Sequence, residues 1–104
     1  MTLRQTQNLY RRALGEILRE ERHAQALNLR TVSTQAAIAL GYLSEIERGQ
    51  KEISSELLQV LTVNGLGVET HEIIIRAALR MAGLDVPDTA ESLINRIDEY
   101  ADLR

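Results

Sequence analysis

The chain has 104 residues, of which 44% are hydrophobic, and it contains no cysteine, so one hydrophobic core is expected and disulfides and thiolate metal sites are excluded. Its net charge of −3 is unevenly spread, because residues 1–51 hold eight basic and five acidic side chains whereas residues 52–104 hold four and ten. No segment approaches the roughly 20 apolar residues that span a bilayer, so we expect a cytoplasmic protein without a membrane partner.

The first predicted element is a helix over about residues 8–25. Its apolar residues recur every three or four positions and form one stripe, made of Leu9, Leu14, Ile17, Leu18 and Ala24. The remaining positions are rich in Arg and Glu and are expected to face solvent.

Residues 27–58 predict three short helices joined by tight turns. Asn28 can cap the first of them, Gly49 can end the second in a left-handed conformation, and Ser54 can cap the third. Two helices separated by about three residues cross steeply and leave the polar side of the second one pointing outward. This pattern predicts a helix-turn-helix, a motif that places one helix in a groove of DNA.

Residues 61–72 contain two glycines and predict a turn that ends at Thr70, which can cap a further helix. That helix, over residues 71–83, has too many apolar residues for one stripe, so we expect it to be buried on two sides.

After a break at Pro87, a final helix over residues 89–103 carries a second apolar stripe. We therefore divide the chain into a DNA-binding domain, residues 1–83, and a helical dimerisation extension, residues 84–104. Surplus apolar surface favours a two-fold dimer, and packing back onto the same chain is the alternative. The expected interface residues are Ile74, Leu79, Leu93, Ile97 and Tyr100.

The segment GYLSEIERGQKE follows a helix of the form LxxVSxxA and precedes SSELL. Over roughly residues 14–82 this layout resembles the XRE/Cro-type helix-turn-helix family, and over residues 41–58 it is most similar to the actinobacterial Clp gene regulators. The resemblance implies an all-α, lambda-repressor-like bundle of five helices, here with an extra C-terminal helix. It also implies an ion pair between Arg22 and Glu47. The chain departs from the family pattern at the turn, where Ala37 replaces the usual Gly, and at the recognition-helix cap, where Ala39 replaces Ser or Thr.

In the docking geometry that the resemblance implies, the start of the recognition helix enters the major groove. The residues expected to face base edges are Leu40, Gly41, Ser44 and Glu45. The residues expected to contact the sugar-phosphate backbone are Asn28, Arg30, Tyr42, Arg48, Gln50 and Lys51. For Arg48, a solvated position beside Glu45 or Glu52 is the alternative.

These observations predict a regulator of transcription that binds double-stranded DNA as a homodimer on palindromic operators. The resemblance implies activation of Clp protease genes and turnover by the Clp protease itself. The alternative is an antitoxin whose C-terminal helices bind a toxin while the helix-turn-helix regulates its own promoter. An enzyme is not expected, because no nucleophile pattern or phosphate-binding glycine loop is present. His23 and His71 lack partners at metal-ligand spacing, so no metal or cofactor is expected.

Overall fold

The computed structural model describes residues 1–87 together with Ser92, Asn95 and Asp98. Over these residues the fold is all-helical, with no strand, and the predicted five helices are confirmed. The helices are α1 (Leu3–Ala24), α2 (Leu29–Ala36), α3 (Leu40–Glu47), α4 (Ser55–Gln59) with its π-helical continuation η1 (Val60–Gly65), and α5 (Thr70–Met81). The predicted final helix lies outside the described residues.

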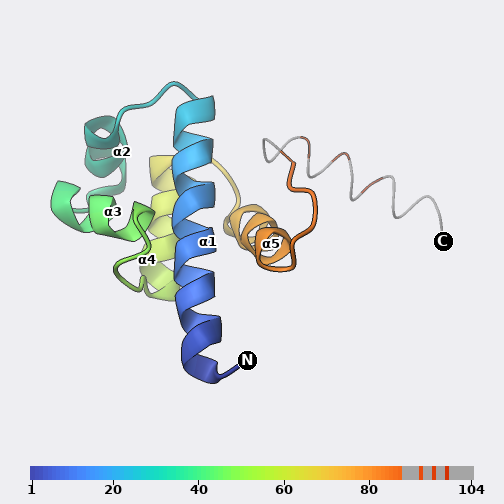
Figure 1. Cartoon of the computed structure of the whole chain (residues 1–104). Helices are drawn as coiled ribbons and strands as arrows, with labels where there is room; N and C mark the ends of the chain where they lie inside the picture. The colour runs from blue at the N-terminus through green and yellow to red at the C-terminus, as the bar shows by residue number, and fades with distance from the viewer. Residues whose placement is uncertain (88–91, 93–94, 96–97, 99–104) are drawn as a thin grey trace.

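Helix α1 stands between two groups of helices, with α2, α3 and α4 on one side and α5 on the other (Figure 1). It begins earlier than the predicted residue 8 because Thr2 and Gln5 form a capping box. The Thr2 hydroxyl accepts a hydrogen bond from the Gln5 amide at 3.2 Å, and the Gln5 side chain accepts one from the Thr2 amide at 2.7 Å. The prediction was wrong there because the first turns of α1 contribute nothing to the buried stripe on which it depended.

The local signals of the helix-turn-helix are present as predicted. The Asn28 side chain accepts a hydrogen bond from the Thr31 amide at 2.8 Å, and the Ser54 hydroxyl accepts one from the Leu57 amide at 3.2 Å. Gly49 has a φ of 73° after the end of α3. Ala37 adopts the left-handed conformation, with a φ of 54°, at the position where the family usually has glycine, which costs about 1–2 kcal/mol.

Two predictions around residues 60–70 were wrong. Residues Val60–Gly65 are helical rather than a turn, and Gly65 packs tightly on α2. A Cβ atom on Gly65 would lie 3.1 Å from a Val32 methyl carbon and 3.2 Å from the Ala36 Cβ. Thr70 is the first residue of α5 and not its cap; its hydroxyl instead shares a hydrogen bond of 2.7 Å with that of Thr62.

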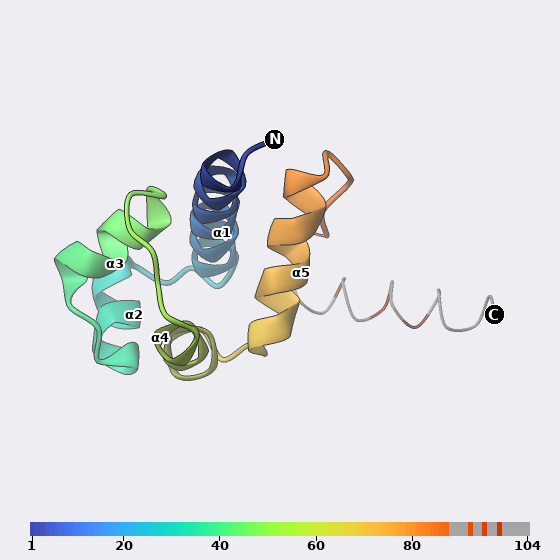
Figure 2. The same ribbon diagram turned by 90° about the horizontal axis from the view of Figure 1, so that it is seen from below.

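The core lies where α1 meets the other helices. Its buried residues come from every helix and include Leu14, Ile17, Leu18, Val32, Leu43, Ile46, Leu58, Leu61, Ile73 and Ala77. Helix α5 packs on α1 and contributes Ile73 and Ala77 to the core. Ile74 and Ala78 are exposed, and the segment that follows α5 runs back beside it on the side away from α1 (Figure 2). The predicted burial of a second side of α5 requires a further partner and stays a prediction.

The packed body extends to the end of the continuously described chain. Val86 packs against the core and Pro87 is buried. Within the described residues, none of the helices combines the length and apolar character that a membrane span requires.

Candidate nucleic-acid interface

Helices α2 and α3 form the predicted helix-turn-helix. They are joined by residues 37–39, and the Ser33 hydroxyl donates a hydrogen bond across this turn to the Ile38 carbonyl. Leu43 and Ile46 bury one side of α3 in the core. The opposite side of α3 is thereby left toward solvent.

The C-terminal end of α3 docks directly on α1. A Cβ atom on Gly15 would lie 2.5 Å from the Ile46 carbonyl oxygen and 2.6 Å from that of Glu47. Only a residue without a side chain allows this approach. Sequence reasoning missed Gly15, although a glycine inside a strongly periodic helix is the usual sign of a close contact.

Arg22 and Glu47 form a bidentate ion pair, with Nε–Oε2 at 2.8 Å and Nη2–Oε1 at 2.9 Å. Arg22 also donates to the Leu27 carbonyl at 3.0 Å, so the pair joins α1, the segment before α2, and α3. Both side chains are nearly buried, at 11% and 7% exposure. The hydrogen bond to Glu47 raises the pKa of the Arg22 guanidinium. This arrangement fixes the end of α3 and hence the direction in which its outer side points.

The four residues expected to face base edges all remain accessible. Gly41 is exposed, and Leu40, Ser44 and Glu45 are partly exposed. The Glu45 carboxylate lies 4.0 Å from the Lys51 ammonium, and both side chains are at least one third exposed. Such an exposed pair contributes little, so both groups are available to a ligand.

The expected backbone-contacting residues flank α3 on both sides. Asn28 and Arg30 are exposed at the start of α2, and Gln50 and Lys51 are exposed after α3. Because the Asn28 side-chain oxygen accepts hydrogen bonds from Thr31, its amide NH₂ is the group that can donate to a phosphate.

Arg48 and Tyr42 make contacts within the chain. Arg48 is exposed and donates from Nε to the Ser44 carbonyl at 3.3 Å. The Tyr42 hydroxyl donates to the Glu52 carbonyl at 2.8 Å, so its proton is used to brace the loop after α3. No group of three potential metal-ligating side chains occurs among the described residues, and His23 and His71 are exposed.

Comparison with known proteins identifies relatives of one kind, although no family model matches the chain. Over 74 residues the chain is 47% identical to the transcriptional regulator ClgR of Mycobacterium tuberculosis, covering 71% of this chain and 65% of that relative. Two crystal structures of the Clp gene regulator ClgR from Corynebacterium glutamicum match with TM-scores of 0.65 and 0.66 and identities of 42% and 35%. These matches cover 69% and 90% of this chain, and 92% and 88% of the crystallised ones.

These relatives are transcriptional regulators and not enzymes, and they confirm the resemblance predicted from the sequence. The chain belongs to the ClgR family of transcriptional regulators.

Proposed function

We propose that the chain binds double-stranded DNA in a sequence-specific manner, as a homodimer on palindromic operators, and activates genes of the Clp protease. The observation that carries the proposal is the presentation of α3, which exposes its outer side while Gly15 and the Arg22–Glu47 pair hold its end. The relatives named as Clp gene regulators support the choice of target genes. Turnover by the Clp protease remains a prediction from the resemblance.

The direct test is selection of binding sites from random duplexes, followed by binding measurements on the selected sequence. We expect enrichment of a palindrome whose half-sites are about one turn of B-DNA, roughly 34 Å, apart. Failure to enrich any sequence would contradict the proposal.

Glu45 provides a prediction about base reading. Its carboxylate can accept a hydrogen bond from a cytosine amino group in the major groove. We expect Glu45→Gln to change the preferred base at one operator position by about 1–3 kcal/mol, measured by competition between single-base operator variants. Glu69→Gln is the matched control, because Glu69 is exposed at the start of α5 and should leave every preference unchanged. An unaltered preference in Glu45→Gln would remove Glu45 from the reading surface.

The outward side of α5 supports the proposed dimer. It carries an apolar strip in which Ile74 is 39% exposed, Ala78 is exposed, and Ile75 and Leu79 are partly exposed. Full burial of each large apolar side chain contributes about 1.5–3 kcal/mol. Dimerisation also places two recognition helices on one palindrome, which converts weak half-site binding into strong binding. Leu93, Ile97 and Tyr100 lie outside the described residues and enter the proposed interface from the sequence pattern alone.

Ile97→Asp is therefore expected to give a folded, largely monomeric protein that has lost its preference for palindromes. The physical reason is that a carboxylate in an apolar interface must be desolvated without a partner. Sedimentation of the chain across a concentration series measures the change. Asn95→Asp adds the same side chain at an exposed position and should remain dimeric. A tight dimer in Ile97→Asp would restrict the proposed interface to α5.

A further inference from the structure

The first half of α1 has a strongly basic character that the assigned DNA contacts do not use. Between Leu3 and Gly15 it carries Arg4, Arg11 and Arg12, and its first acidic residue is Glu16. Arg4 and Arg11 are seven residues apart and therefore lie on the same side of the helix. Arg4 is exposed and Arg11 is partly exposed.

This side of α1 lies next to the loop that follows the recognition helix. A Cβ atom on Gly49 would lie 3.0 Å from the Cα of Arg12, so the loop is in backbone contact with α1. Figure 2 shows the start of the loop between α3 and α4 beside α1. Gln50 and Lys51, which belong to the proposed backbone contacts, are thus adjacent to α1.

A cavity of about 160 Å³ separates the two segments, and Arg11, Lys51 and Glu52 are among its lining residues. Two cations and one carboxylate leave the cavity with a net positive charge. Arg11 donates from Nη2 to the Asn8 side chain, but among the described residues its Nε is buried without a hydrogen-bond acceptor. A buried donor without a partner is costly, so the hydrogen bond to Asn8 does not use all of the hydrogen-bonding capacity of Arg11.

We propose that Arg11 and Lys51 together bind one phosphate of the DNA backbone beside the groove entered by α3, and that Arg4 extends this contact along α1. Helix α1 then contacts DNA itself, in addition to holding α3 in place. The inference rests on the proposed DNA binding. The expected occupant is a DNA phosphate for two reasons. The loop after α3 lines the cavity, and one cation comes from that loop while the other comes from α1.

The test measures the salt dependence of binding to the selected operator and to an unrelated duplex. Arg11→Gln and Lys51→Ala should each reduce the slope of log affinity against log salt by about 1. Each should weaken both duplexes by a similar factor, about fivefold at 0.15 M salt, without changing base preference. Arg11→Lys keeps the charge and should retain most of the slope. Glu52→Gln should strengthen binding to both duplexes, because it removes a carboxylate beside the phosphate.

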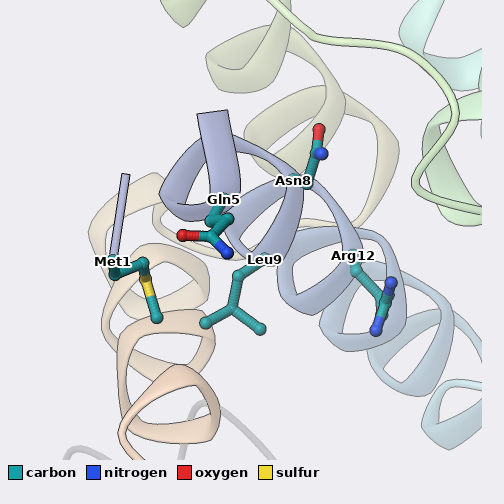
Figure 3. Close-up of a pocket in the computed structure, with 5 residues that line it drawn as sticks. All are labelled: Met1, Gln5, Asn8, Leu9 and Arg12. Atoms are coloured by element: carbon teal, nitrogen blue, oxygen red, sulfur yellow. The ribbon is translucent and has the colours of Figure 1, made fainter. Parts of the chain in front are cut away.

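Arg12→Gln is the matched control, since it removes the same charge from the same turn of α1. Arg12 lines a separate hollow of about 480 Å³ with Met1, Gln5, Asn8 and Leu9 (Figure 3). The slope of log affinity against log salt for Arg12→Gln should equal that of the unmodified chain within error.

An unchanged slope in Arg11→Gln, or an equal loss in Arg12→Gln, would overturn the inference while leaving the proposed function intact. Absence of duplex binding by the unmodified chain would instead overturn the proposed function. If thermal unfolding shows that Arg11→Gln does not fold, Arg4→Gln becomes the deciding variant, because Arg4 is exposed and its replacement should lower the salt slope without affecting stability.

Discussion

Replacing Arg76 with alanine should lower the free energy of unfolding by about 3–5 kcal/mol, as expected when one partner of a buried ion pair is removed. Arg76 has no exposed side-chain surface, and its Nη1 lies 2.7 Å from Oε1 of the buried Glu21. The other Glu21 oxygen accepts a hydrogen bond from Gln25, which also donates to the Leu66 carbonyl. The substitution leaves the Glu21 carboxylate buried without its cation. Urea denaturation at neutral pH measures the loss.

Arg80→Ala is the matched control one turn later on α5. Arg80 pairs with Glu16 and Glu20 at the surface, where its side chain is 30% exposed, and its loss should cost no more than about 1 kcal/mol. The double variant Glu21→Gln/Arg76→Met should recover much of the stability, since it leaves no charge buried. Equal losses for Arg76→Ala and Arg80→Ala would show that burial does not set the strength of these pairs.

Gly15→Ala should also be strongly destabilising, although alanine is the better helix former. In an exposed helix this change gains roughly 1 kcal/mol. Here the new Cβ would lie 2.5–2.6 Å from the carbonyl oxygens of Ile46 and Glu47, which belong to the backbone and cannot rotate away. We expect a loss of about 1–3 kcal/mol, and weaker operator binding because the end of α3 must move off α1.

Gly41→Ala, on α3, should have the opposite effect and raise the stability of the chain. A Cβ atom there meets no atom within 4 Å, so the variant should be stabilised by about 0.5–1 kcal/mol. Both variants are compared by urea denaturation of the unliganded chain. Equal stability of the two would mean that the contact between α1 and α3 is not tight in solution.

The parts of the fold that the sequence predicted are those encoded locally. The caps at Asn28 and Ser54 and the left-handed Gly49 depend on neighbouring residues, and each is where the pattern places it. Glu21 continues the buried stripe of Leu14, Ile17 and Leu18 at helical spacing, so the periodicity could have shown its burial. Its partner Arg76 could not be predicted, because the pair spans 55 positions along the chain. The helical state of Val60–Gly65 was missed because glycine is a turn signal in the sequence, whereas Gly65 here closes a helix and allows close packing on α2.

The part of the candidate site that was predictable is the part that follows from the resemblance to the family. Sequence reasoning placed Leu40, Gly41, Ser44 and Glu45 on one side of a short helix, and the structure leaves all four accessible. It treated Arg11 as a solvated charge. The cavity beside Lys51 arises only when the loop after α3 folds against α1, which no spacing in the sequence reveals.

One unbroken helix holds both α3 and α5. Helix α3 docks at Gly15 and α5 pairs at Glu21, and these positions are about 9 Å apart along the axis of α1. No hinge separates them, so the recognition helix cannot turn relative to the proposed dimer surface without breaking one of the two contacts. One additional base pair between half-sites rotates the second half-site by roughly 35° about the DNA axis. Within the described part of the chain no joint between α3 and α5 absorbs that rotation, so we expect a dimer held through α5 to tolerate altered operator spacing only through twisting of the DNA.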